Sequence, residues 1–344
     1  MIEIDGSLGE GGGQVIRSSL ALAALRGTPV RIINIRAGRK QPGLKRQHLT
    51  AVQAIATICE ANVTGADLGS SQLTFEPKSI RAGEYKFQIG TAGSTTLVAQ
   101  TILPALMSAD RPSKVVIEGG THNPWCPPFE FFSKTFLPQV AKIGPQITAT
   151  LEAYGFFPAG GGRIQLSIEP CQQWKGMELM ELGDKPVPRV TAIVSNLPRE
   201  IAERECKTIE RLSNWPSDAF QVIEVERPIG PGNVVMIELA SKHVTEVVIS
   251  IGSPSIPAER VAKQALKAAR SYLKCAVPVG EYLADQLILP MAIAASQGQK
   301  SSFRTVCLSS HSTTHIEIVK KLLDIDISVT QEQTGDVLVE LEQF

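Results

Sequence analysis

The feature that most constrains the fold is an order of elements that repeats along the chain. Over Ile2–Glu76, hydrophobic periodicity predicts a strand, a Gly-rich loop, an apolar helix, a strand, a second helix and two short strands, and the same order returns from Tyr85. A third copy is expected to begin at Glu281, because Gln286–Ala292 (QLILPMA) echoes Gln100–Leu106 (QTILPAL). The pattern predicts an α/β (α+β) protein of three βαβαββ-type units, with chance similarity between apolar helices as the alternative.

A segment with Pro- and Gly-rich edges separates the second copy from the third. Its own periodicity predicts a strand, a helix, three strand-like runs and a final helix. We therefore expect a large domain whose first two units cover 1–181, an inserted smaller α/β domain over 182–277, and the third unit over 278–344. A chain of 344 residues, 43% of them hydrophobic, is long and apolar enough for two cores.

The charge balance restricts the kind of partner. The 34 Lys and Arg residues equal the 34 Asp and Glu residues, so any polyanion must be met by a local patch. Such a patch is present at Arg36–Arg46 (RAGRKQPGLKR), which contains five cations and no acid and is followed by Gln47 and His48. A solvated loop is the usual interpretation of a charge run, but the absence of interspersed acids favours a phosphate-binding loop.

A second basic stripe is expected on the last helix of the inserted segment. Its members recur at helical spacing, which favours a solvated face, with RNA contact as the alternative. They are Arg260, Lys263, Lys267, Arg270 and Lys274.

The Gly-rich loop Gly9–Gln14 (GEGGGQ) stands between an expected strand and an expected helix. Backbone N–H groups in such a loop can contact a phosphate. No GK[ST] follows, so the loop is not a P-loop, and the acidic residue of the dinucleotide fingerprint is missing. A structural turn and an anion site are equally good interpretations, and Glu10 slightly favours the second, because a carboxylate can hold a divalent metal that bridges phosphate oxygens.

Histidine is scarce, with five residues in the chain. His311 lies in Ser309–His315 (SSHSTTH), after an expected strand and at the start of an expected helix. That position suits contact with a phosphate, and a neutral imidazole is a competent nucleophile, although a capping or core histidine is the more common role. His122 and His243 have no recognisable partner in the sequence and are expected to be structural.

The cysteines and the apolar stretches indicate the cellular compartment. The six cysteines are scattered without a C-x-x-C pair, a pattern typical of reduced thiols in a cytosolic protein. The longest apolar stretch, Leu97–Met107, is interrupted by Gln100 and Pro104 and is far shorter than the ~20 residues that span a bilayer. We expect a cytoplasmic protein with no membrane partner.

Several segments, in the same order from end to end, resemble the RNA 3'-terminal phosphate cyclase family. They are Asp5–Leu20 (DGSLGEGGGQVIRSSL), Ile35–Val52 (IRAGRKQPGLKRQHLTAV), Tyr154–Ile164 (YGFFPAGGGRI, close to the family signature), Gly280–Ala292 (GEYLADQLILPMA) and the His311 segment. The resemblance implies repeated units similar to those of EPSP synthase and of the C-terminal domain of a translation initiation factor, with a smaller domain inserted before the last unit. It also implies that ATP and an RNA with a 3'-terminal phosphate are the substrates. The product is a 2',3'-cyclic phosphate, formed through a histidine-AMP intermediate and an RNA-adenylate.

By position, the resemblance makes His311 the adenylylated nucleophile and Glu10 the ligand of a divalent metal, Mg²⁺ or Mn²⁺. It assigns phosphate and RNA binding to Gln14, Arg17, Arg36, Arg39, Gln47 and His48. It assigns ATP binding to Gln100, Pro127, Tyr282, Leu283, Ala284, Asp285 and Gln286, with Tyr282 and Pro127 beside the adenine. Two residues depart from the family pattern: Tyr154 replaces a usual basic residue, and His315 stands where many members have Asn.

Three other functions compete with the cyclase interpretation. A branch of the family that acts in ribosomal RNA maturation lacks the nucleophilic histidine, so His311 argues against it. A plain RNA-binding protein would keep the fold and the basic loop without any chemistry. A small-molecule transferase like EPSP synthase is supported by the repeat pattern alone. The sequence does not define the oligomeric state.

Overall fold

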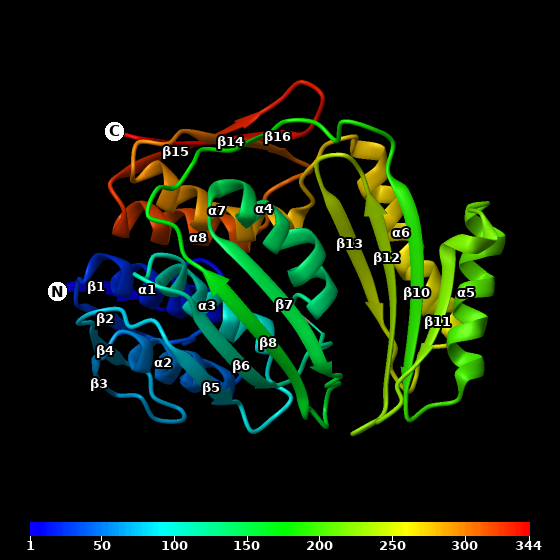
Figure 1. Cartoon of the computed structure of the whole chain (residues 1–344), viewed down its shortest axis with the longest axis horizontal. Coiled ribbons are helices and arrows are strands. Elements are labelled where there is room, and N and C mark those ends of the chain that lie inside the picture. The colour runs from blue at the N-terminus through cyan, green and yellow to red at the C-terminus, as the bar shows by residue number, and fades with distance from the viewer. Residues whose placement is uncertain (125) are drawn as a thin grey trace.

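The computed structural model describes residues 1–124 and 126–344 and contains four four-stranded sheets in this part of the chain (Figure 1). In the first sheet, β1 (Ile2–Asp5) pairs in parallel with β2 (Val30–Ile33), and β2 pairs antiparallel with β4 (Leu73–Glu76). The sheet is completed by β3 (Asn62–Thr64) beside β4. Helix α1 (Gly13–Arg26) connects β1 to β2, and α2 (Arg46–Ile58) connects β2 to β3.

The second sheet has the order β5-β6-β8-β7, with β5 parallel to β6 and the other pairs antiparallel. Its elements are β5 (Glu84–Gln88), α3 (Thr95–Met107), β6 (Ser113–Gly119), η1 (Phe131–Phe136), α4 (Leu137–Ile143), β7 (Gln146–Ala153) and β8 (Gly162–Glu169). The sequence predicts one helix over Pro128–Ile143, whereas the structure has the π-helix η1 followed by α4. Pro138, at the start of α4, lacks the backbone N–H that an α-helical turn would use, which accounts for a wider turn before it.

The third sheet has the order β9-β14-β16-β15, again with its first pair parallel and the others antiparallel. Its elements are β9 (Glu178–Leu179), α7 (Glu281–Ala295), β14 (Ser301–Thr305), α8 (Ser310–Leu322), β15 (Ile325–Gln331) and β16 (Val337–Gln343). The sequence places the start of the third copy at Glu281, whereas β9 lies before the segment 182–277. A two-residue strand is too short to show an alternating pattern. The three sheets share one strand order, which is the order that a repeat requires, while a common unit and a similarity to EPSP synthase stay predictions.

The fourth sheet belongs to the segment 182–277 and has the order β11-β10-β12-β13. The elements of this segment are β10 (Val187–Ser195), α5 (Arg199–Ser213), the 3₁₀ helix η2 (Ser217–Ala219), β11 (Phe220–Glu224), β12 (Gly232–Ala240), β13 (Thr245–Ile251) and α6 (Ala258–Cys275). Its strands and helices enclose a separate apolar cluster, which includes Val190, Ile209 and Leu266. In Figure 1 this sheet stands beside the other three, and β13 contacts η1.

The apolar core of the three-sheet body packs around its helices. Helix α1 contacts both α3 and α8, and α7 contacts α8, so helices from the three sheets meet at one place. Among the described residues, no helix combines the length and apolar character needed to cross a membrane. The meeting place of these helices is also where the candidate residues gather.

Candidate active site

Two segments that lie far apart in the sequence meet at the candidate site. The Gly-rich loop follows the carboxyl end of β1, and the segment that leads into α8 follows the carboxyl end of β14, the edge where α/β sheets usually bind ligands. Gly9 has a φ of 55°, and a Cβ built on it would overlap Thr314 of α8. Only glycine permits both this backbone conformation and this close approach, so the loop lies directly against the first turns of α8.

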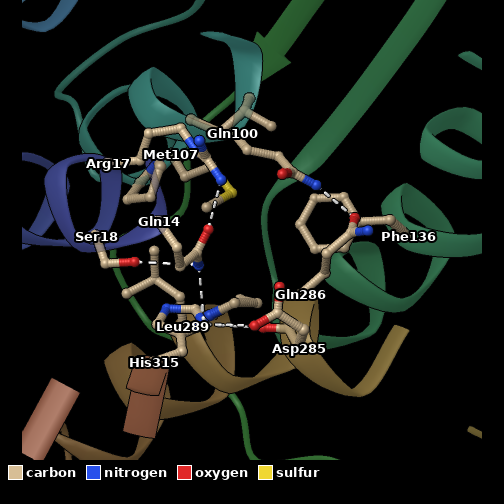
Figure 2. Close-up of a pocket in the computed structure, with 13 residues that line it drawn as sticks. Gln14, Arg17, Ser18, Gln100, Met107, Phe136, Asp285, Gln286, Leu289 and His315 are labelled. Atoms are coloured by element: carbon tan, nitrogen blue, oxygen red, sulfur yellow. Dashed lines mark hydrogen bonds and ion pairs between the residues drawn. The ribbon is translucent and has the colours of Figure 1, made fainter. Parts of the chain in front are cut away.

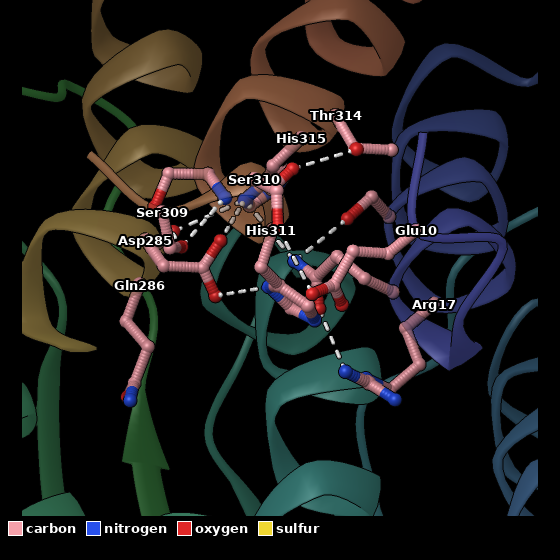
Figure 3. Close-up of polar contacts among 12 residues, drawn as sticks. Glu10, Arg17, Asp285, Gln286, Ser309, Ser310, His311, Thr314 and His315 are labelled. Carbon is pink, nitrogen blue, oxygen red and sulfur yellow. Dashed lines mark hydrogen bonds and ion pairs between the residues drawn. The ribbon is translucent and has the colours of Figure 1, made fainter. Parts of the chain in front are cut away.

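His311 lies in the first turn of α8, which Ser309 caps by accepting the N–H of Ser312 at 3.1 Å. Its Nδ1 is 3.0 Å from Oδ2 of Asp285 on α7 (Figure 3). A carboxylate only accepts hydrogen bonds, so Nδ1 carries the proton and Nε2 holds the lone pair. The His311 side chain is 32% exposed. Its Nε2 has no hydrogen-bond partner among the described residues, so the geometry suits a nucleophile.

Asp285 is the residue that orients this histidine. Its burial alone would raise the pKa of the carboxyl, but hydrogen bonds from His311 and His315 outweigh burial and hold that pKa below its ordinary value of 3.8. The carboxylate is therefore charged at neutral pH, when it favours a protonated Nδ1 on its partner. The resemblance implies a place for Asp285 in the ATP site, whereas its contacts in the structure are with the two histidines.

His315 lies one turn further along α8, and its side chain is 2% exposed. Its Nδ1 is 3.0 Å from the main-chain oxygen of Asp285, 3.3 Å from Oδ1 of Asp285 and 3.1 Å from Nε2 of Gln14 (Figure 2). Its Nε2 is buried without a hydrogen-bond partner in the described part of the chain. Because His315 is enclosed between α1 and α7, it is poorly placed to attack a substrate, and His311 is the better candidate.

Two predicted phosphate-binding side chains lie beside the first residue of α1. A Cβ on Gly13 would come 2.5 Å from Nε2 of His48 and 2.8 Å from one terminal nitrogen of Arg17. Arg17 is buried and donates to Oε1 of Gln14 at 2.7 Å, and burial lowers its pKa to about 10, which leaves it charged at neutral pH. Burial, followed by repulsion from Arg17, lowers the pKa of His48 to about 3, so His48 is neutral. Arg17 is thus a buried cation next to the backbone of Gly13, which carries no side chain. This combination is favourable for binding an anion.

Glu10 connects the basic loop to α8. Its Oε1 accepts a hydrogen bond from the Ser310 hydroxyl at 3.0 Å, and its Oε2 lies 3.4 Å from the Arg39 guanidinium. The predicted metal ligand thus lies next to His311, and Arg39 reaches the same place. Sequence reasoning missed Ser310, although the hydroxyl-rich run around His311 was a signal for it.

The other polar residues of this region hold its loops. Arg36 donates to the carbonyl oxygens of Gln41 and Gly43 at 2.8 and 2.9 Å, so it shapes the basic loop. Gln47 accepts the backbone N–H of Ser94, the N-cap residue of α3, at 2.6 Å. These contacts fix the basic loop against α3.

A small cavity of about 40 Å³, lined by both polar and apolar side chains, lies where α1, α3 and α7 meet (Figure 2). Its lining includes five predicted site residues, and the amide of Gln100 donates to the side-chain oxygen of Gln286. The five are Gln14, Arg17, Gln100, Asp285 and Gln286. This volume is enough for ordered water but far too small for an adenine.

The predicted adenine site therefore depends on residues outside this cavity. Tyr282 at the start of α7 is 71% exposed. Pro127 lies in a loop held by a 2.7 Å hydrogen bond from the Thr96 hydroxyl to its carbonyl oxygen. Leu283 and Ala284 are fully buried in the core. Their assignment to the ATP site stays a prediction.

The residues available to a metal ion are few. Within residues 1–124 and 126–344, no group of three or more His, Cys, Asp or Glu side chains gathers as a metal site. Mg²⁺ in phosphate-binding proteins commonly takes one or two carboxylates and completes its shell with phosphate oxygens and water. The exposed carboxylate of Glu10 fits a metal that is held jointly with a phosphorylated ligand.

The fold and the site together define a mixed α/β protein in which a histidine–aspartate pair lies near arginine side chains. The profile described as RNA 3'-terminal phosphate cyclase matches residues 8–329. The chain belongs to this family. It is 46% identical over 97% of its length to the RNA 3'-terminal phosphate cyclase of Koribacter versatilis, and the match covers 93% of that protein. It is 45% identical over 99% of its length to the protein of the same name from Ectopseudomonas mendocina, of which 98% is covered. These matches confirm the resemblance found in the sequence.

Proposed function

We propose that this protein uses ATP to convert an RNA 3'-terminal phosphate into a 2',3'-cyclic phosphate. The observation that carries the proposal is the 3.0 Å contact between His311 Nδ1 and Asp285, which leaves Nε2 without a hydrogen-bond partner among the described residues on a side chain that is 32% exposed. Ser310, the preceding residue, donates to Glu10, which also contacts Arg39. Relatives that are 45–46% identical over nearly the whole chain bear the name of this activity. The non-catalytic branch of the family is disfavoured because its members lack this histidine.

In the first step, Nε2 of His311 attacks the α-phosphorus of ATP and pyrophosphate leaves. A P–N bond forms, the P–O bond to pyrophosphate breaks, and the positive charge that develops on the imidazole is stabilised by the Asp285 carboxylate at Nδ1. The proton stays on Nδ1, so the ring leaves as a neutral imidazole in the next step. Arg17 and Arg39 would balance the charge of the phosphate oxygens.

In the second step, an oxygen of the RNA 3'-phosphate attacks the same phosphorus, and His311 is released. The resulting RNA-adenylate carries AMP as a good leaving group, which a phosphate monoester lacks. In the third step, the adjacent 2'-hydroxyl attacks the terminal RNA phosphorus, loses its proton and displaces AMP. The cyclic phosphate remains on the RNA.

The remaining predicted residues take supporting roles in this proposal. Glu10 would hold Mg²⁺ or Mn²⁺, which when bound supplies charge neutralisation at phosphate oxygens. Tyr282 and Pro127 would flank the adenine, and Gln100 and Gln286 would form the polar floor behind it. Gln14, Arg36, Gln47 and His48 would position the phosphate-binding groups.

We further infer that the three sheets of common order are copies of one βαβαββ-type unit, similar to EPSP synthase. In this proposal the segment 182–277 is a domain inserted into a large domain formed by 1–181 and 278–344. The shared strand order and the separate apolar cluster of the segment support both inferences.

Incubation with ATP labelled at the α-phosphate tests the proposal. We expect the wild type and His315→Ala to retain acid-labile AMP on the protein, and His311→Ala to retain none. His311→Ala should still cyclise an RNA that already carries an adenylylated 3'-phosphate, because His311 serves only the activation steps. Retention of AMP by His311→Ala but not by His315→Ala would reverse the assignment, and no retention by the wild type would favour a plain RNA-binding protein.

A further inference from the structure

The loop that joins β7 to β8 holds one aromatic ring out in solvent. Tyr154 and Phe156 point inward and stack at 6.2 Å between ring centroids, and both lie close to the ring of buried His122. His122 is in turn fixed by a 2.6 Å contact with Glu130. Phe157, the next residue, is 65% exposed. No step of the reaction above uses this ring.

Glycine contacts hold this loop tightly from two sides. Gly160 has a φ of 70°, and a Cβ on it would come 3.0 Å from Cα of Ala92 in the turn before α3. On the other side, a Cβ on Gly161 would come 2.8 Å from Cδ1 of Ile229, and one on Gly232 would overlap the ring of Phe156. The exposed ring is therefore presented by a rigid segment wedged between the second sheet and the segment 182–277.

Ile229 extends the exposed apolar surface at this point. Its side chain is 55% exposed, and the neighbouring Gly230 lies against Ala159 of the β7–β8 loop. Pro158 is exposed as well. We call Phe157, Pro158 and Ile229 the rim patch. A partner that covers these side chains would remove apolar surface from water, which is favourable.

The rim patch is continuous with the phosphate-binding loop through one turn of the chain. Ala92, which touches Gly160, accepts a hydrogen bond from the Asn123 amide at 2.5 Å. Two residues later, Ser94 donates its N–H to Gln47 at 2.6 Å. Gln47 directly follows the basic run Arg36–Arg46. These contacts connect the rim patch to the basic loop, so an RNA strand whose terminal phosphate lies among those cations would reach the rim patch by extending along this turn.

We propose that the rim patch binds a base of the RNA a few nucleotides upstream of the 3'-terminal phosphate, stacked on the ring of Phe157. This rests on the proposed function. Single-stranded RNA is commonly held by cations along its backbone and by aromatic rings against its splayed bases, and stacking of this kind tolerates any base. A rigid, exposed ring next to a basic loop supplies both parts. A protein partner at the same patch is the competing possibility.

A double-mutant cycle that combines a protein variant with RNAs that lack one base tests the stacking. KM for cyclisation is measured with 3'-phosphate RNAs in which each of the last few upstream bases is removed in turn, for the wild type and for Phe157→Ala. We expect Phe157→Ala to raise KM on the order of ten-fold with intact RNA. At one position, removal of the base should raise KM for the wild type and have no further effect on Phe157→Ala.

Three controls separate stacking from damage to the protein. Phe157→Tyr should keep a KM near that of the wild type, whereas Phe157→Leu should behave like Phe157→Ala, because only a ring stacks. Phe344→Ala removes another ring, 80% exposed at the far end of the chain, and should change nothing. Adenylylation with ATP alone should be equal in all variants, since no RNA takes part.

The results distinguish the two proposals. A wild type that is adenylylated but cyclises no RNA would refute the proposed function. Normal cyclisation with no coupling between Phe157 and any base would refute the stacking alone and leave the patch to a protein partner. Equal KM values for Phe157→Leu and the wild type would also refute the stacking of a base on Phe157.

Discussion

Replacement of Asp285 by asparagine tests the central geometry of the site. Both oxygens of the carboxylate face histidine Nδ1 atoms, Oδ2 toward His311 at 3.0 Å and Oδ1 toward His315 at 3.3 Å. An asparagine has one acceptor and one donor at these positions, so it satisfies only one ring. If its NH₂ group faces His311, the proton of that ring moves to Nε2 and the lone pair needed for attack is lost.

The expected loss follows from the kind of hydrogen bond removed. A hydrogen bond to a charged group is worth about 1.5–3 kcal/mol, and the imidazole gains positive charge during the attack. Loss of that stabilisation in the transition state corresponds to a rate lower by roughly ten- to a hundred-fold. Loss of the correct tautomer would add to this.

Single-turnover adenylylation with labelled ATP, quenched in acid, measures the rate. A matched control is Asp336→Asn, which exchanges the same groups in a buried carboxylate that accepts from Arg304 at 2.7 Å outside the site. We expect the control to retain the wild-type rate. A rate for Asp285→Asn within about three-fold of the wild type would show that the carboxylate does not orient the nucleophile.

Three further predictions concern the surroundings of the pair. Arg39→Lys keeps the charge but loses the paired donors of a guanidinium, so we expect cyclisation to fall clearly below wild type at both low and high salt, and a wild-type rate would leave only a basic patch. Gly13→Ala should remove most of the cyclisation activity, since its Cβ would displace the side chains of His48 and Arg17, while thermal unfolding should show an intact fold. Full activity would mean that the site relaxes around the added methyl group. Burial raises the pKa of Glu246 from 4.5 to about 8, so the native state holds a proton that the unfolded chain releases, and stability should fall as pH rises between those values. Urea unfolding of Glu246→Gln should show a flatter pH dependence over that range, and an unchanged slope would refute the assignment.

Much of the fold was predictable where local pattern and tertiary structure agree. Helix α3 covers Thr95–Met107 and includes the whole apolar stretch Leu97–Met107, because this apolar run follows the capping residue Ser94. Strand β9 was not predictable, since two residues carry no period and their pairing with β14 depends on distant packing. The π-helix η1 before α4 also depends on how this part of the chain packs, although Pro138 marks where η1 ends.

Some residues of the candidate site could likewise be predicted from the sequence, and others could not. Residue type and position singled out His311 and Glu10, and the structure places both at one end of α8. The partner of His311 was not evident, because an aspartate on another helix becomes its orienting group only through folding. Leu283 and Ala284 share a short segment with Tyr282, yet helical geometry turns them into the core while Tyr282 faces solvent.

The pairing of β9 with β14 has a consequence for how the protein matures. Residue 178 pairs with residue 302, so the third sheet closes only after the whole segment 182–277 has been synthesised. The helix with His311 is made about 300 residues after the loop with Glu10, yet the two lie in contact. Contacts between such distant residues form slowly, because a long chain must be ordered before they stabilise anything. A chain that stops before α8 would therefore have the loop with Glu10 but not the histidine that we propose as the nucleophile, and we expect it to retain no AMP.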